Sequence, residues 1–174
     1  MKRIKFVLLA ASILVSATAW SQKYHDAEND GMKGHVKSVT TSSNGETQTL
    51  YYSVDGKTQQ SDVSNPVYNS KGYMTSCDFT MMGHTGKMTF TYNSNNKISK
   101  QVLSIEGGTI TQEYTYNGDG TEKTETTTMS NQGMSQSMTI SFTYDSFDSH
   151  GNWTRRTGHV GGQSAQESRT IVYW

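Results

Sequence analysis

The chain has 174 residues, enough for one domain, and its 15 basic residues balance its 15 acidic ones. Three of the basic residues precede residue 22, so the rest of the chain carries 12 Lys and Arg against 15 Asp and Glu, a net charge of −3. Apart from Arg155–Arg156 that part has no basic cluster, which argues against nucleic acid and anionic membranes as partners.

The first 21 residues have the organisation of a secretory signal peptide. Three basic residues precede an apolar run from Phe6 to Val15, and Ala17–Ala19 offers a cleavage site, although a cut after Ser21 fits equally well. The run is too short to span a membrane, and no cysteine lies at the cleavage site. We therefore expect residues 1–21 to be removed. The mature chain should be periplasmic or extracellular, neither a lipoprotein nor stably inserted in a membrane.

The composition of the mature chain predicts a thin or one-sided core. Only 42 of the 153 residues from Gln22 onward are apolar, a low share for a globular domain, but they are patterned and the aromatic ones recur. Residues 22–32 are mostly polar and should form a flexible leader, and residues 33–174 should form the folded domain. Cys77 is the only cysteine and alternates with Thr75 and Phe79, which favours a small core residue over a reactive thiol.

One short pattern recurs five times along the domain. An aromatic residue precedes Asp, Asn or Ser, and three positions after that polar residue stands Gly or Asn. Asp and Asn side chains bond to the backbone two residues on, and Gly accepts the positive φ of a tight turn. The copies start at Tyr52, Tyr68, Tyr92, Tyr116 and Phe147, so they predict repeated turns whose aromatic rings line up on one sheet face. The residues assigned to these turns are Tyr68, Asn69, Gly72, Tyr92, Asn93, Tyr116, Asn117, Gly120, Phe147, Asp148 and Gly151.

The segments between these turns read as β-strands. Met88–Tyr92 and Met138–Tyr144 alternate apolar and polar residues, and Gly-containing turns such as Asn44–Gly45 and Gly161–Gly162 fall between the repeats. Strands poor in apolar residues, such as Lys57–Asp62 and Thr121–Thr128, should lie between the richer ones. The expected fold is all-β: an antiparallel meander of about 10–11 strands built from repeated hairpins. The poor strands favour an open, curled sheet over a closed barrel.

The last copy also carries a resemblance to a known family. Tyr144-Asp145 and the run from Phe147 to Arg156 resemble the YD (Rhs-type) repeat, whose core is Tyr-Asp-x-x-Gly-Asn/Arg followed by an apolar residue. The segment 31–39 is similar to the opening of small secreted Bacteroidota proteins that carry such repeats. Over residues 31–174 only one copy is strong, because the others replace Asp with Asn or Ser. The resemblance implies a strip of hairpins. Large family members wrap such a strip around another polypeptide, for which this chain is too short.

Signals for catalysis or metal binding are weak. The five histidines form no His-x-His or His-x3-His pair, so we expect no metal and no cofactor. No nucleophile elbow or phosphate loop is present, which predicts a chain without enzymatic activity, although a distant carboxylate pair for glycoside hydrolysis stays open. Methionines flank two turns; thioethers suit Cu(I), but filling of a thin core is the favoured role. They are Met81, Met82, Met88, Met129, Met134 and Met138.

These features together predict a non-catalytic, secreted β-repeat module with a structural role, or one that binds a protein or glycan at the cell envelope. Trp153, Tyr73 and Trp174 are the candidate binding residues, because exposed aromatic rings can stack on sugars or anchor a partner. One alternative is a soluble β-barrel that holds a small apolar ligand. Another is an outer-membrane β-barrel, suggested by the terminal Trp174, but the polar strands cannot supply its apolar band.

Overall fold

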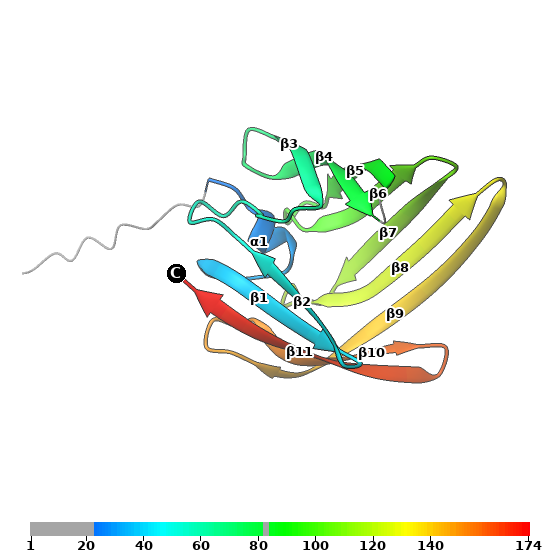
Figure 1. Ribbon diagram of the computed structural model, residues 1–174. Coiled ribbons are helices and arrows are strands. Elements are labelled where there is room, and N and C mark those ends of the chain that lie inside the picture. Colours follow the sequence, from blue (N-terminus) through cyan, green and yellow to red (C-terminus); the bar gives the residue numbers. More distant parts are fainter. Residues whose placement is uncertain (1–22, 82–83) are drawn as a thin grey trace, which may run out of the picture.

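The protein is built on one antiparallel sheet of eleven strands, which confirms the all-β prediction. The computed structural model describes residues 23–81 and 84–174 (Figure 1), so the expected signal peptide and Met82 lie outside the described residues. The strands are β1 Val36–Ser43, β2 Glu46–Tyr51, β3 Val63–Tyr68, β4 Met74–Met81, β5 His84–Tyr92, β6 Ile98–Ile105, β7 Gly108–Tyr116, β8 Glu122–Asn131, β9 Met134–Phe147, β10 Trp153–Val160 and β11 Gln163–Tyr173.

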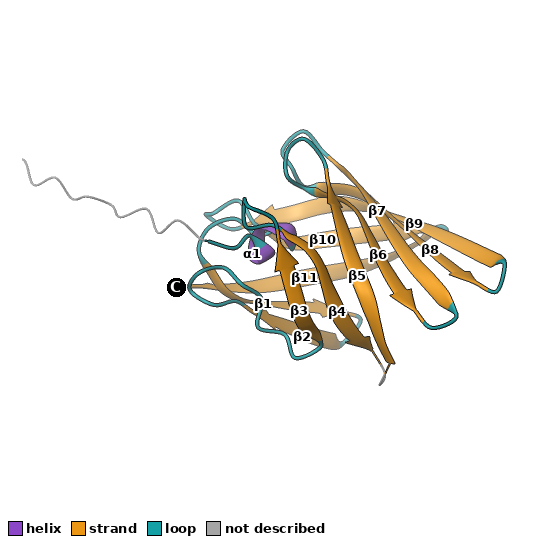
Figure 2. Ribbon diagram, turned by 90° about the horizontal axis from the view of Figure 1, so that it is seen from above, coloured by secondary structure: helices purple, strands orange, loops and turns teal. Residues whose placement is uncertain are grey.

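The sheet is a meander from β3 to β11, with the β1–β2 hairpin added beyond its last strand. Because β1 pairs with β11, the order is β2-β1-β11-β10-β9-β8-β7-β6-β5-β4-β3. β2 and β3 are consecutive in the chain but lie at opposite edges of the sheet. Figure 2 shows the sheet curled around the helix α1. The two edge strands do not pair, so the open, curled sheet is confirmed and the closed barrel is not formed.

The connection between the two edges corrects one expected strand. Lys57–Asp62 was predicted to be a polar strand, but only an isolated bridge between Tyr52 and Thr58 occurs there. The segment has to cross from β2 to β3, so only its start pairs with the end of β2, where the N–H of Gln59 donates to the carbonyl of Tyr51 at 2.8 Å. Its polarity therefore reflects a crossing loop at the seam of the sheet.

All five copies of the repeated pattern form the same turn. In the last copy, Asp148 N–H donates to the carbonyl of Asn152 at 2.8 Å, and Gly151 N–H donates to the carbonyl of Asp148 at 3.1 Å. The Asp148 carboxylate also accepts hydrogen bonds from the N–H groups of His150 and Asn152, both at 2.9 Å. The residue three positions after the polar one has a positive φ in every copy: 87° at Gly56, 85° at Gly72, 56° at Asn96, 84° at Gly120 and 79° at Gly151.

Two-residue turns occupy the opposite end of the strip, because consecutive hairpins turn at alternate ends. Asn44–Gly45, Gln132–Gly133 and Gly161–Gly162 each have two successive residues with positive φ. This backbone matches the right-handed twist of the flanking strands and is favoured in tight hairpins. The two ends of the sheet therefore differ: one carries the longer repeat turns and the other carries the tight ones.

A short helix, α1 (Asp26–Asn29), lies at the repeat-turn end of the curled sheet (Figure 2). Ala27 and Met32 are buried beside Tyr52, in a core cluster that also includes Val36 and Val39. This corrects the prediction of a flexible leader. Two apolar residues are too few to signal an amphipathic helix, but they suffice to fill one end of a curled sheet. No helix of the described ranges is long and apolar enough to cross a membrane.

Three tyrosines form a ladder at this end, on the face turned toward α1. Each hydroxyl donates to the carbonyl oxygen of the first residue of the preceding strand, so each ring bridges a pair of strands. The bonds are Tyr92 to Met74 at 2.6 Å, Tyr116 to Ile98 at 2.6 Å and Tyr144 to Glu122 at 2.8 Å. The expected alignment of rings is therefore present for Tyr92 and Tyr116.

Phe147 does not take the corresponding place, which corrects the prediction for the last copy. Its side chain is 45 % exposed and stacks on Tyr144 at 5.9 Å between ring centroids. The β9–β10 register shifts between Arg155 and Arg156, so Asp145 has no partner in β10. Such a bulge changes which side chains face inward, and Tyr144 joins the ladder instead.

Threonines explain why the apolar-poor strands are stable. Thr126 and Thr139 share a hydroxyl hydrogen bond of 2.9 Å across β8 and β9, and Thr128 and Ser137 share one of 2.8 Å. β-branched residues favour strands, and such cross-strand pairs add stability on a solvated face. One face of the sheet can therefore remain polar while the other carries the core.

The predictions for the single cysteine and for three of the methionines have opposite outcomes. Cys77 is buried, and burial raises the pKa of its thiol to about 11, so the predicted core role is confirmed. Met129, Met134 and Met138 do not fill the core as expected: all three are exposed, Met134 to 75 %. They lie on the long β8–β9 hairpin, which extends beyond the packed end of the sheet. The three methionine side chains are therefore exposed, because this part of the hairpin lies outside the packed core.

Candidate functional site

A trough on the inner face of the curled sheet, beside α1, is the candidate functional site. It has two adjoining compartments of about 210 Å³ and about 140 Å³. Both are lined by Asn29, Asp30, Ile98 and Gln101. We call the larger one the polar compartment, because charged and amide side chains of β6–β8, β10 and β11 line most of it. We call the smaller one the apolar compartment, because β3–β6 supply it with apolar residues.

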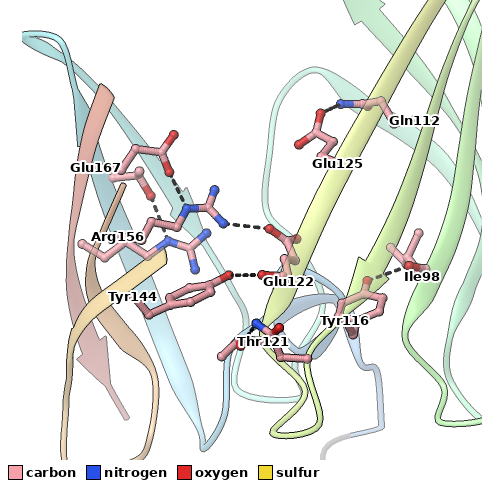
Figure 3. Close-up of polar contacts among 12 residues, drawn as sticks. Ile98, Gln112, Tyr116, Thr121, Glu122, Glu125, Tyr144, Arg156 and Glu167 are labelled. Atoms are coloured by element: carbon pink, nitrogen blue, oxygen red, sulfur yellow. Dashed lines mark hydrogen bonds and ion pairs between the residues drawn. The ribbon is translucent and has the colours of Figure 1, made fainter. Parts of the chain in front are cut away.

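An ion-pair network forms the wall of the polar compartment on the β8, β10 and β11 side (Figure 3). Arg156 contacts Glu122 at 2.7 Å and Glu167 at 2.6 Å, so one guanidinium joins three strands. The two carboxylates raise the pKa of Arg156 despite its burial. Arg156 therefore remains charged and pairs with both acids.

Aromatic rings support the two arginines of this wall. The guanidinium carbon of Arg156 lies 3.9 Å from the centre of the Phe142 ring and 4.4 Å from that of Trp153. Arg169 lies 3.8 Å from the Trp153 ring. Burial, and then the positive charge of Arg156, lower the pKa of Arg169 to about 10. Contact with the ring face offsets part of the cost of burying two cations together.

Gln101 and Glu125 line the wall formed by β6–β8, and Gln112 lies between them on β7. The Gln112 amide donates to Glu125 at 2.6 Å and is itself bonded to the amide of Gln101. Thr127 donates a second bond to Glu125 at 3.0 Å. Burial raises the pKa of the neighbouring Tyr114 hydroxyl, so this group stays protonated. The wall thus presents fixed donors and acceptors rather than a free acid.

The third wall comes from α1 and the residue after it. The Asp30 carboxylate accepts a hydrogen bond from the Tyr52 hydroxyl at 2.6 Å, and Asp26 accepts one from Tyr68 at 2.7 Å. Burial raises the pKa of Asp26, and burial aided by the charge of Asp26 raises that of Asp30 to about 6. Two carboxylates are therefore held over the trough in surroundings that disfavour their charge.

Four buried side-chain atoms lack a hydrogen-bond partner within the described residues, and all four belong to residues that line the trough. They are Asp26 Oδ1, Asn29 Oδ1, Thr58 Oγ1 and Arg169 Nη1. Buried polar atoms are rarely left unpaired, because each one costs about 1–3 kcal/mol. Because all four lie in residues of the trough, a polar ligand would gain the most binding free energy from hydrogen bonds there.

A wider groove of about 770 Å³ lies at the tips of β6–β9, but it is a weaker candidate. Its lining includes the exposed Met129 and Met134, near the two-residue turn before β9. None of the four unpaired buried atoms belongs to its lining. An open groove at a hairpin tip provides little specificity for a ligand. The trough, with its unpaired polar atoms, is therefore the better candidate for a binding site.

The three predicted binding aromatics are not brought together. Trp153 is 5 % exposed and contacts the arginines of the polar compartment. Tyr73 is also buried, and it stacks on His25 and packs edge-on against Tyr92. Trp174 is 52 % exposed and has the ammonium group of Lys37 at 4.8 Å from its ring centre. Of the three, only Trp153 therefore contacts residues that line the trough.

Sequence reasoning missed the charged residues of the trough. Glu122, Glu125 and Arg156 stand on strands that were predicted only to be poor in apolar residues. Glu167 and Arg169 stand on β11, where no site residue was predicted. A signal was nevertheless present in β11, where Glu167 and Arg169 share the alternation of Ile171 and Tyr173 and so lie on the inward face. A charged residue in phase with apolar neighbours predicts an inward position.

The described part of the chain contains no group of three or more His, Cys, Asp or Glu arranged to hold a metal ion. No family model matches the sequence, and no curated protein shows significant similarity to it.

Proposed function

We propose that the protein is a non-catalytic module, exported to the periplasm or the cell exterior, that binds a glycan in the polar compartment of the trough. The observation that carries this proposal is the buried, unpaired Nη1 of Arg169 beside a wall of amide and carboxylate groups. Sugar hydroxyls both donate and accept hydrogen bonds, so they match a wall of mixed donors and acceptors. Tyr114 and Tyr116 add aromatic surface to the same lining.

The size of the compartment limits the ligand. A volume of about 210 Å³ equals that of roughly seven waters at about 30 Å³ each, which suits a single sugar ring. A monosaccharide, or the terminal residue of a longer glycan, is therefore the expected ligand. The acids of the two walls are engaged by Arg156 and Gln112, which supports binding rather than proton transfer.

Fluorescence of Trp153 provides a direct test. After removal of residues 1–21 the chain keeps two tryptophans, so Trp174→Phe leaves Trp153 as the only one. We expect a saturable change in its emission with at least one member of a monosaccharide panel. Arg169→Gln should weaken that response roughly tenfold, because a charge-assisted bond is lost. Arg155→Gln, which changes an exposed neighbour of Arg156, should not.

Two outcomes would contradict the proposal. A silent panel, together with capture of a specific envelope protein by the mature chain, would replace the glycan with a protein partner. Release of reducing ends from a bound glycan would show catalysis, with Asp30 as the candidate acid because its pKa lies near 6.

A further inference from the structure

The apolar compartment has chemistry that glycan binding does not use. Its volume is about 140 Å³, and apolar side chains of β4–β6 form its floor, among them Met74, Cys77, Met88 and Phe90. Thr58 and Gln60 also line it, and both belong to the loop that crosses between the unpaired edge strands. The compartment therefore lies at the seam of the sheet, where main-chain pairing does not close it.

Three residues that line this compartment each have a side-chain oxygen without a hydrogen-bond partner in residues 23–81 and 84–174. These oxygens are Asp26 Oδ1, Asn29 Oδ1 and Thr58 Oγ1. Asp26 and Asn29 stand three residues apart, so they share one side of α1. Thr58 adjoins them, since its N–H donates to the other Asp26 oxygen at 2.8 Å. The lining of this one compartment thus carries three unpaired acceptor oxygens.

The Asp26 carboxylate also forms no direct ion pair with any residue that the structure describes. It is 4 % exposed, and its paired oxygen accepts bonds only from neutral groups, Thr58 N–H and the Tyr68 hydroxyl. His25 bonds to Glu28 at 2.9 Å, and the Lys57 ammonium, 6.0 Å from the Tyr68 ring centre, acts on Asp26 only through its charge at longer range. A buried carboxylate without an ion pair is costly, which favours a cationic ligand.

We propose that the apolar compartment binds a small primary ammonium compound with an apolar body. An ammonium group has three N–H donors, which matches the three unpaired oxygens. The floor suits a body about the size of one aromatic ring, because an apolar cavity of about 150 Å³ accommodates benzene. Apart from Asn29, which lines both compartments, these features do not belong to the proposed glycan site.

Methionine-methyl NMR of the mature protein tests this assignment, with benzylammonium as the probe. Met74 and Met88 line the compartment, whereas Met129 and Met134 lie at the distant hairpin tip and serve as internal references. We expect saturable ring-current shifts at Met74 and Met88 only. Neutral benzyl alcohol, which has the same ring, should bind roughly tenfold more weakly because it lacks the charge-assisted bonds.

Two variants distinguish the contribution of the Asp26 charge to binding from that of the cavity volume. Asp26→Asn keeps an acceptor for Thr58 and Tyr68 but removes the charge, so it should reduce the preference for benzylammonium over benzyl alcohol to about one. Asp145→Asn, an exposed site, is the matched control. Cys77→Leu fills the floor and should abolish binding of both probes, which keeps the test decisive if Asp26→Asn fails to fold.

The proposal is overturned if wild-type protein binds the two probes equally, if only Met129 and Met134 shift, or if no methyl group shifts. The glycan site can fail independently. Cys77→Leu should leave the saccharide response of Trp153 unchanged, and Arg169→Gln should leave the benzylammonium shifts unchanged.

Discussion

The Tyr92 hydroxyl donates a hydrogen bond of 2.6 Å to the carbonyl of Met74 and accepts one of 3.0 Å from the Asn29 amide. One side chain of the sheet therefore joins the tyrosine ladder to the helix that fills its end. A helix of four residues is not stable by itself, so contacts of this kind hold α1 in place. The walls of the trough depend on them.

Replacement of Tyr92 should show this double role. We expect Tyr92→Ala to lower the free energy of unfolding by about 2–4 kcal/mol, through loss of a large packed ring. Tyr92→Phe should cost about 1–3 kcal/mol, because it leaves the Met74 carbonyl and the Asn29 amide unpaired. Tyr116→Phe, which removes only the bond to Ile98, is the matched control and should cost less. Chemical denaturation measures all three, and equal costs for the two Phe variants would show that the α1 contact contributes nothing.

Packing of the N-terminal segment against a repeat turn gives a second prediction. A Cβ atom at Gly72 would collide with the backbone carbonyl of Lys23, whereas one at Gly120 would meet only the end of the Lys97 side chain at 3.9 Å. The two glycines hold equivalent positions, with φ of 85° and 84°. Both Ala variants therefore carry the same backbone strain of about 1 kcal/mol. Gly72→Ala should lower the melting temperature further, and equal melting temperatures would argue that residues 23–25 can leave the turn freely.

The ion-pair network predicts unequal effects for two adjacent arginines. Arg156→Ala removes the shared partner of Glu122 and Glu167 and should cost about 3–5 kcal/mol, because two largely enclosed carboxylates lose their counter-ion. Arg155→Ala changes an exposed side chain and should stay within about 0.5 kcal/mol. Urea titrations compare the variants. If Arg156→Ala were as stable as Arg155→Ala, the network would have no structural role.

The raised pKa of Asp30 predicts a specific pH dependence. The folded protein binds a proton at Asp30 up to about pH 6, whereas in the unfolded chain this group titrates near its ordinary value of 3.8. Between these values the folded state holds more protons. The free energy of unfolding should therefore fall as pH rises through this window, by on the order of 1–3 kcal/mol. Asp26, whose pKa is also raised, contributes in the same direction.

Asp30→Asn isolates this effect, since the amide oxygen can still accept the Tyr52 bond. Urea midpoints at pH 4.5 and pH 6.5 should differ less in the variant than in the wild type, and the variant should be the more stable protein at pH 6.5. If both proteins showed the same pH dependence, a group other than Asp30 would be responsible for the change in stability.

Much of the fold was readable from local sequence. The aromatic–Asn–x–x–Gly pattern specifies its turn through groups within five residues, because the polar side chain, the backbone amides and the residue with positive φ all lie in the same loop. Alternation then predicted strands such as β5 and β9 and the antiparallel meander. Asn96 occupies the position of Gly in one copy because Asn, unlike most residues other than Gly, accepts φ near 56°.

The trough was decided by the tertiary structure alone. α1 contains too few apolar residues to be recognised, and its stability comes from Tyr52, Tyr68 and Tyr92, which are 22 to 63 residues away from their partners in the chain. Arg156 meets Glu122 only because the sheet is curved, as the two residues stand on strands separated by β9. Local patterns determine turns and strands, because their interactions span a few residues. The curl of the sheet, the pairing of β1 with β11 and the grouping of charged residues in the trough depend on contacts between residues that are far apart in the chain.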